Sequence, residues 1–316
     1  MNIPVFYNKN HFLHDPKFEL FFGKKMPYAE RALRLASILN SLTLEGFKLN
    51  KAKSFSLENI LSVHDKSYVD FIKKQTRILK DNETISPSSF IMDTYTPLQK
   101  HTFGVAKKSV DLALSGAEAI SSKKTVVYSL CRPPGHHAEK NRMGGYCYFN
   151  NSAIAANYLS RSGKVAILDI DFHHGNGTQS IFYDRSDILF VSIHADPRQK
   201  YPCLTGFENE KGIGKGLGFN INYPLSVGTG ELKYQKSFEK ALINIRNYKP
   251  KYLVVSAGFD TYINDPIGGF KLKIPFYKTM AQKIASLELP TLIIQEGGYN
   301  IKDLGKLAAS FLKGFD

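Results

Sequence analysis

The sequence lacks long apolar runs and has few cysteines. No stretch approaches the roughly 18 consecutive apolar residues that a membrane span requires, and the first residues, MNIPVFYNKNHF, contain no basic segment followed by an apolar one. The three cysteines, Cys131, Cys147 and Cys203, cannot all pair within one chain and are too few for a disulfide framework. We therefore expect a soluble protein of the cytoplasm that has no membrane partner.

Internal repeats, low-complexity tracts and a domain linker are also lacking. A chain of 316 residues with 43% hydrophobic content can bury a sizeable core, and we predict one domain over residues 1–316. The formal net charge is +14, but the basic residues are dispersed along the chain, which is typical of ordinary solvated faces. We therefore expect no nucleic-acid partner.

Short β-branched runs alternate with segments of helical period. The runs lie at 125–130, 164–170, 188–193, 252–257 and 291–296, and helical periodicity is found at 28–42, 152–161, 231–245 and 275–287. This alternation predicts an α/β fold with a mostly parallel central sheet and helices on both faces. The stretches 80–97 and 201–218 lack both patterns, so we expect loops that could border a pocket.

Polar motifs follow all five β-branched runs, and most histidines lie among them. The motifs are CRPPGHH, DFHHGNG, HAD, GFD and GGY. They include five of the nine histidines: His136, His137, His173, His174 and His194. Because ligands bind at the carboxyl ends of strands in open parallel sheets, we expect these motifs to meet in an active site there. The isolated histidines are expected to be structural: His11, His14, His64 and His101.

The segment DIDFHHGNG (169–177) has the pattern of a metal site. Strand alternation would place Asp169, Asp171 and His173 on one side. Zinc accepts imidazole nitrogen and carboxylate oxygen, and three protein ligands leave a position for water or substrate. Asp260 ends another apolar run and is a natural further ligand, because an unpaired buried carboxylate is costly. Taken alone, Asp260 fits a helix cap or a turn equally well.

Four segments resemble signature segments of the superfamily of histone deacetylases and acetylpolyamine amidohydrolases. They are RPPGHHAEKNRMGGYCYFNN (132–151), DIDFHHGNGTQ (169–179), SAGFDTYINDP (256–266) and EGGYN (296–300). The resemblance runs along nearly the whole chain. The motifs HHGNG, EGGY and KFELFFG (17–23) are most similar to those of acetylpolyamine amidohydrolases and class II deacetylases. The resemblance implies a single-domain arginase-deacetylase-like fold.

The same resemblance implies two metal sites. One zinc ion per chain is expected on Asp171, His173 and Asp260. A structural potassium ion is expected on Asp169, Asp171, His173, Ser192 and Ile193, several of them through backbone carbonyls. Asp169 is also expected to accept a hydrogen bond from His136 and so to fix the tautomer of that ring.

Amide hydrolysis by metal-activated water is the activity that the resemblance implies. By resemblance, His137 is the general base and then the general acid, His136 tunes the electrostatics beside it, and Tyr299 donates to the developing oxyanion. Taken alone, GGY is a tight glycine turn with an exposed aromatic. Asn176 stands where many class I deacetylases have an aspartate, so it should raise the pKa of the second histidine less than a carboxylate would.

Five further positions are assigned to substrate binding. Tyr146 and Tyr201 match aromatic walls of a narrow tunnel, although ordinary packing is the alternative for both, and Gly145 is assigned with them. Glu19 matches a carboxylate that lies near the cationic substrate of acetylpolyamine amidohydrolases, with a solvated surface acid as the alternative. Asp93 is a further candidate at the rim.

The resemblance implies that the substrate is an acetylated polyamine or acetyl-lysine in a protein, and we favour a small acetylpolyamine-like amine. Three features weigh against the polyamine: the short 80–97 segment, Ile267 in place of the gatekeeper glutamate of vertebrate polyamine deacetylases, and the positive charge. A non-catalytic acyl-binding relative and a binuclear manganese ureohydrolase are more distant alternatives. A cysteine nucleophile, Cys131 or Cys147, is another. A homo-oligomer is compatible with the sequence.

Overall fold

The computed structural model describes residues 3–21, 23–122 and 125–316, so residue 22 of the 17–23 motif lies outside it. An eight-stranded sheet with the order β10-β9-β8-β11-β12-β7-β1-β4 forms its centre, and every neighbouring pair is parallel. The strands are β1 (Val5–Tyr7), β4 (Leu49–Lys51), β7 (Val126–Ser129), β8 (Val165–Asp169), β9 (Ile188–Ala195), β10 (Asn220–Leu225), β11 (Tyr252–Ala257) and β12 (Thr291–Gln295). The predicted parallel sheet is confirmed.

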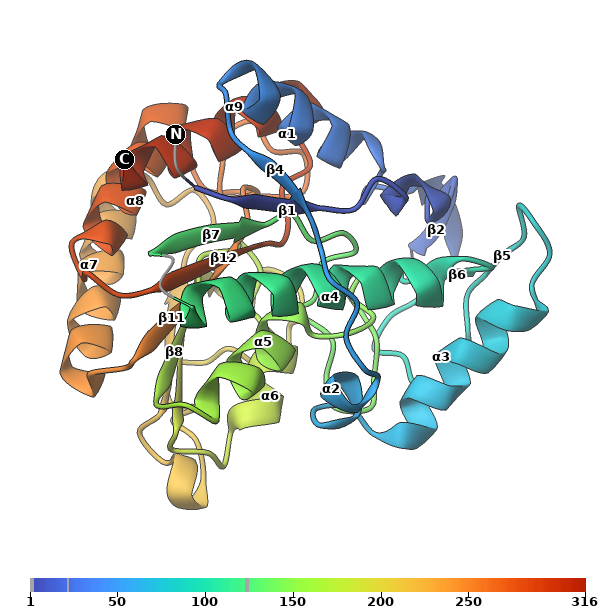
Figure 1. Ribbon diagram of the computed structural model, residues 1–316, viewed down its shortest axis with the longest axis horizontal. Helices are drawn as coiled ribbons and strands as arrows, with labels where there is room; N and C mark the ends of the chain where they lie inside the picture. Colours follow the sequence, from blue (N-terminus) through green and yellow to red (C-terminus); the bar gives the residue numbers. More distant parts are fainter. Residues whose placement is uncertain (1–2, 22, 123–124) are drawn as a thin grey trace.

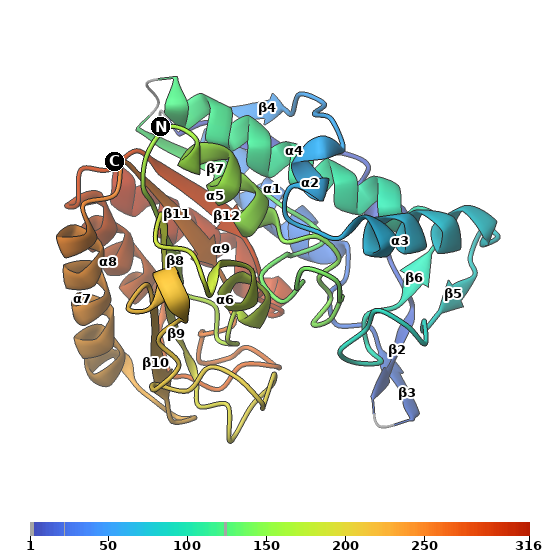
Figure 2. The ribbon, with the colours of Figure 1, turned by 90° about the horizontal axis from the view of Figure 1, so that it is seen from below.

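Helices cover both faces of this sheet (Figure 1 and Figure 2). One face packs against α1 (Leu33–Leu44), α7 (Glu231–Tyr248), α8 (Ile274–Ala285) and α9 (Ile301–Leu312). The core on the other face includes α2 (Glu58–Leu61), α3 (Lys66–Ile78), α4 (Thr102–Ser121), α5 (Asn151–Ser160) and α6 (Asn176–Phe182). Short 3₁₀ helices are η1 (His11–Leu13), η2 (Gly214–Gly216) and η3 (Lys313–Phe315). None of the described helices combines the length and apolar character needed to cross a bilayer.

Two antiparallel pairs lie outside the central sheet. They are β2 (Phe18–Phe21) with β3 (Lys24–Pro27), and β5 (Thr84–Ile85) with β6 (Leu98–Gln99). Figure 2 shows both pairs projecting on the side of the molecule away from α7 and α8. Glu19 belongs to β2, so this projecting hairpin supplies a predicted site residue.

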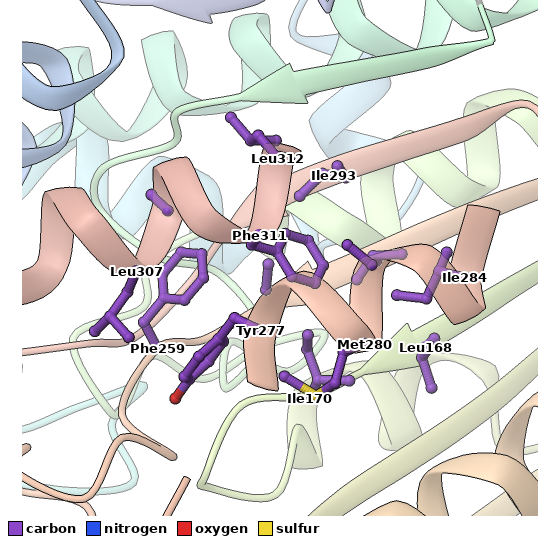
Figure 3. Close-up of a cluster of buried hydrophobic side chains, with 14 of the residues drawn as sticks. Leu168, Ile170, Phe259, Tyr277, Met280, Ile284, Ile293, Leu307, Phe311 and Leu312 are labelled. Atoms are coloured by element: carbon purple, nitrogen blue, oxygen red, sulfur yellow. The ribbon is translucent and has the colours of Figure 1, made fainter. Parts of the chain in front are cut away.

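Successive sheet side chains point to different helical layers. Along β8, Leu168 belongs to one buried cluster and Ile167 to the other. Figure 3 shows the first cluster, in which Leu168 and Ile293 of the sheet join Met280 of α8 and Phe311 of α9. Burial on both faces explains why the strands read as continuous apolar runs and not as alternating patterns.

The chain reverses its direction across the sheet between β8 and β11. After β8 it continues to β9 on one side, and after β11 it continues to β12 on the other. The loops that leave neighbouring strand ends therefore diverge, which opens a crevice at the carboxyl edge. Residues 170–175 follow β8 and residues 258–273 follow β11, so both loops with predicted metal ligands begin at this edge.

The boundaries of the predicted elements differ in places from those of the structure. The helix predicted over 28–42 begins at Leu33, because the Ala32 N–H donates to Asp15 (2.8 Å) and Glu30 is committed to buried ion pairs. The apolar runs do not reveal β1 and β4, since a three-residue strand is too short to show a pattern.

Candidate metal centre and active site

The loops after β8 and β11 bring Asp171, His173 and Asp260 together. Because β8 ends at Asp169, the expectation that strand alternation continues to His173 is wrong. The side chains nevertheless converge: His173 Nδ1 lies 3.3 Å from Asp171 Oδ1 and 3.0 Å from Asp260 Oδ2. Among the described residues, this is the one group of at least three His, Cys, Asp or Glu side chains spaced to hold a metal ion.

The spacing of these three groups fits a divalent cation. Zinc ligands at about 2.0–2.1 Å and tetrahedral angles lie about 3.3 Å from one another. The backbone fixes the carboxylates, since Gly297 N donates to Asp171 Oδ2 (2.8 Å) and Phe172 N donates to Asp260 Oδ1 (2.9 Å). A Cβ atom on Gly297 would lie 2.6 Å from an oxygen of each carboxylate, so only glycine leaves this space open.

Without a cation, the pKa values of Asp171, His173 and Asp260 are set by burial and by the charges of neighbouring side chains. Burial raises the pKa of Asp260, and repulsion from Asp171 adds to the effect. Burial alone would also raise the pKa of Asp171, but His136 and His173 hold it well below its usual range. Burial lowers the pKa of His173, but hydrogen bonds to the two carboxylates raise it to about 9. A divalent cation would displace the proton of His173 and neutralise the two carboxylates in its place.

Two adjacent histidines lie beside this group and have different partners. His136 Nδ1 lies 3.0 Å from Asp169 Oδ2, and His137 Nδ1 lies 2.8 Å from Asn176 Oδ1. Because both partners are acceptors, each ring carries its proton on Nδ1. Burial lowers the pKa of His136, but Asp171 and Asp169 raise it to about 10, whereas burial and the charge of His136 hold the pKa of His137 well below 6.5. The pair therefore combines a charged ring with a neutral one.

A cavity of about 440 Å³ opens onto His137 and His173. Its volume lies in the range of small-molecule sites. The predicted residues that line it are His137, His173, Tyr299, Tyr146, Tyr201, Gly145 and Glu19. Gly145 has φ +53°, and a Cβ atom there would lie 2.2 Å from the His137 ring, so glycine lets the ring approach the backbone.

The Tyr299 hydroxyl is available to a ligand in this cavity. Burial raises the pKa of Tyr299 well above 10, so the hydroxyl keeps its proton. The Arg34 guanidinium lies 4.7 Å from the ring centroid, and the Tyr299 N–H donates to Asp265 Oδ2 (2.6 Å). Within residues 3–21, 23–122 and 125–316, no side chain or carbonyl accepts a hydrogen bond from this hydroxyl.

Glu19 is a buried acid of the cavity wall. Its side chain accepts hydrogen bonds from the Tyr146 hydroxyl (3.2 Å) and the Ala29 N–H (3.2 Å), and the residue is only 8% exposed. Burial raises its pKa. The alternative of a solvated surface acid is therefore wrong.

Asp93 lies behind the wall and does not line the cavity. It accepts hydrogen bonds from Gly145 N (2.6 Å), the Tyr201 hydroxyl (3.0 Å) and Thr96 Oγ1 (2.9 Å). Its carboxylate is therefore directed at the loops of the wall and not at the cavity. Asp93 instead ties the Tyr201 loop to the loop of Gly145.

Three of the expected potassium positions lie on neighbouring strands, and the other two, Asp171 and His173, lie in the loop after β8. Asp169 of β8 pairs in register with Ser192 of β9, and Ile193 follows Ser192; all three are buried. The Ser192 hydroxyl lies 2.7 Å from His194 Nδ1.

The two buried cysteines do not suit nucleophilic chemistry. Cys131 and Cys147 are both fully enclosed, and burial raises the pKa of each thiol above its usual range. A thiolate is therefore disfavoured at either position.

A buried ion network behind the site was not among the predicted residues. Glu30 Oε1 accepts from Arg34 (2.5 Å) and Arg132 (2.9 Å), and Arg34 also donates to the carbonyls of Gly298 (2.6 Å) and Glu296 (2.7 Å). The network therefore holds the turn that precedes Tyr299. Its only signals in the sequence are the i,i+4 spacing of Glu30 and Arg34 and the place of Arg132 in the RPPGHH motif.

Known proteins resemble the chain in both sequence and structure. The histone deacetylase domain family matches residues 28–315. Acetylpolyamine amidohydrolase 2 of Pseudomonas aeruginosa is 39% identical over 98% of each chain, and histone deacetylase HDA1 of Saccharomyces cerevisiae is 36% identical over 81% of this chain and 37% of its own length. A crystal structure of acetylpolyamine aminohydrolase from Burkholderia pseudomallei has a TM-score of 0.94 at 34% identity, covering 99% of this chain and 98% of that one. The chain therefore belongs to the histone deacetylase domain family, and it is a deacetylase, a class of hydrolase.

Proposed function

We propose that this chain is a zinc-dependent deacetylase that releases acetate from small acetylated amines, with acetylpolyamines as the favoured class. One observation carries the proposal: His173, His137 and the unpartnered Tyr299 hydroxyl line the same small cavity. The relatives named acetylpolyamine amidohydrolase, which match over almost the whole chain, support the substrate class.

Asp171, His173 and Asp260 would hold the zinc ion, and Asp169, Asp171, His173, Ser192 and Ile193 would hold a structural potassium ion. When bound, zinc polarises an amide carbonyl and makes nearby water more acidic. The buried and closely spaced donor atoms of the first set support the zinc site.

His137 would move the proton during hydrolysis. Its Nδ1–H is committed to Asn176, so Nε2 has a free lone pair for the proton of the attacking water. The water oxygen bonds to the acetyl carbon, the C–N bond breaks, and the same proton passes from Nε2 to the leaving amine. The charged His136, held by Asp169, disfavours a second positive charge on His137 before the reaction. Tyr299 would donate to the oxygen on which negative charge develops.

The cavity walls suit a short aliphatic amine. Tyr146 and Tyr201 present ring surfaces to a methylene chain, with Gly145 between His137 and Tyr146. Glu19 offers a carboxylate to a protonated amine beyond that chain. Protein acetyl-lysine is the second candidate, because Ile267 and Lys200, and not further acids, also line the cavity.

We also propose that residues 1–316 act as one domain in the cytoplasm. The sequence is compatible with a homo-oligomer. A sedimentation measurement on the purified protein would decide it.

Parallel turnover assays on acetylputrescine, acetylspermidine and an acetyl-lysine peptide test the proposed function, because the ratio of kcat/KM values measures differential binding of the transition states. We expect kcat/KM for acetylputrescine to be at least about tenfold above that for the peptide. A clear preference for the peptide would overturn the polyamine assignment. If the protein hydrolyses none of the three substrates, the assignment as a small-amine deacetylase is itself overturned.

A further inference from the structure

The orientation of Asn176 depends on a residue outside the substrate cavity. We propose that Glu139 is a positioning residue, whose carboxylate fixes the side-chain amide of Asn176 so that its oxygen faces His137. This inference rests on the proposed function, because it assigns Glu139 a role through the proton-transferring histidine.

Three acceptors surround the nitrogen of the Asn176 amide. Asn176 Nδ2 donates to Glu139 Oε1 (3.1 Å), to Met92 Sδ (3.2 Å) and to the His137 carbonyl (3.4 Å). A flipped amide would place its oxygen against all three. Glu139 is the charged acceptor and lies nearest, so it contributes most to the preference.

The amide orientation determines which nitrogen of His137 can act as a base. With Asn176 Oδ1 at 2.8 Å, the proton of His137 resides on Nδ1 and leaves Nε2 unprotonated. A flipped amide would donate to Nδ1 and drive the proton onto Nε2. That tautomer cannot accept a proton from water. Glu139 therefore keeps His137 in the tautomer that can accept a proton on Nε2, without contacting the substrate.

Glu139 is itself well held. Arg142 donates to Oε2 through Nε (3.1 Å) and Nη2 (2.5 Å), which leaves Oε1 for Asn176. The backbone is fixed separately, since the Glu139 carbonyl lies 2.9 Å from His64 Nδ1 and the Glu139 N–H donates to the Arg142 carbonyl (2.9 Å). Changing the Glu139 side chain therefore leaves the loop anchored.

Glu139 and Asn176 line a second cavity of about 930 Å³, which shares Tyr201 with the substrate cavity. Glu139 is absent from the walls of the substrate cavity. Substitutions of Glu139 should therefore change kcat and leave KM for acetylputrescine nearly unchanged. A general disturbance of the pocket would change both.

Exchanging the amide of Asn176 and the carboxylate of Glu139 tests the inference. Asn176→Asp places two carboxylates against each other, and we expect kcat to fall roughly tenfold or more. Adding Glu139→Gln restores a donor and an acceptor with their roles exchanged, so kcat should recover to within about threefold of the native value. Glu139→Ala alone should lower kcat roughly tenfold, and Glu139→Gln alone by less, because an amide oxygen can still accept.

Asp184→Asn is the matched control. Asp184 also lines the second cavity, but the side-chain hydrogen bonds of Asn176 go to His137, Met92 and Glu139, so kcat should not change. The inference would be overturned if the double variant Asn176→Asp/Glu139→Gln lost as much kcat as the product of the two single losses. A native kcat in Glu139→Ala would also overturn it. If Asn176→Asp fails to fold in a melting assay, the comparison of Glu139→Ala with Glu139→Gln decides alone. Absence of deacetylation in the native protein would refute the proposed function instead.

Discussion

At the scale of residues, neighbouring groups of the same type differ because the charges around them differ. His136 lies near the carboxylates of Asp171 and Asp169, which raise its pKa to about 10 against the effect of burial. His137 faces the amide of Asn176, and burial keeps its pKa well below 6.5. In the metal-free protein, one histidine therefore carries a positive charge, and the other stays neutral.

Tyr299→Phe tests the role of the free hydroxyl. We expect kcat for acetylputrescine to fall by about 10²–10³, the usual loss for one oxyanion donor, with little change in KM. The melting temperature should be unchanged, because phenylalanine keeps the ring that contacts Arg34. A loss in kcat of less than threefold would show that the hydroxyl does not serve the chemical step.

Glu19→Gln tests whether the buried acid binds the free ammonium of the substrate. KM for acetylputrescine should rise roughly tenfold, because a charged hydrogen bond of about 1.5–3 kcal/mol is lost. N-acetylbutylamine has the same chain without the ammonium, so its KM should hardly change. Equal effects on both substrates would indicate that Glu19 only supports Tyr146 through their hydrogen bond.

At the scale of elements, the segment before α1 is joined to the loops after β7 and β12 by a buried ion network. Glu30 lies between Arg34 and Arg132, and all three side chains are fully enclosed. Removing the shared carboxylate leaves two buried guanidinium groups without their main partner. This arrangement makes the turn that precedes Tyr299 sensitive to a residue far away in the sequence.

Glu30→Ala should lower the free energy of unfolding by about 3–5 kcal/mol, the usual cost of breaking a buried pair from one side. Chemical denaturation measures this change. The control is Asp70→Ala, which breaks the exposed Lys66–Asp70 pair and should cost less than about 1 kcal/mol. A similar small effect of both substitutions would contradict the structural role of the network.

Elements with a strong pattern could be predicted from the sequence, and so could the residues of the proposed metal site. Strands such as β11 read directly as apolar runs because both faces are buried. Asp171, His173 and Asp260 follow such runs, so their meeting at one edge was predictable. The loop conformation that brings their side chains together was not predictable, because Asp171 and His173 lie beyond the end of the strand.

Contacts between loops that are distant in the chain leave no periodic pattern in the sequence, so they could not be predicted. Asp93 reads as a rim acid, but its partners Gly145 and Tyr201 lie far from it in the sequence. Glu139 stands inside a recognised motif, yet its hydrogen bond to Asn176 exists only after α6 packs beside the loop of β7. Side-chain pairing of this kind depends on tertiary structure and not on local pattern.

At the scale of the whole molecule, many histidines are buried in neutral form. Burial lowers the pKa of His64 and of His194 to about 4. His64 accepts a hydrogen bond on Nε2 from the Asn150 N–H (2.9 Å), so protonation of that nitrogen would break the contact. The unfolded chain, with an ordinary pKa near 6.5, takes up these protons first.

Stability should therefore fall as the pH drops from about 6.5 toward 4, by up to about 3 kcal/mol for each such histidine. Melting of the metal-free protein across this range measures the slope. His64→Gln should flatten it, whereas His101→Gln, at an exposed position, should leave it unchanged. A slope that His64→Gln does not alter would place the acid sensitivity elsewhere.

Zinc titration of the chelator-treated protein tests the central claim most directly. Acetylputrescine deacetylation should be absent after chelation and should return in proportion to added Zn²⁺, with full activity at one equivalent per chain. Asp260→Ala should stay inactive over the same titration. Activity that survives exhaustive chelation, or that needs two metal ions per chain, would contradict a single zinc site on Asp171, His173 and Asp260.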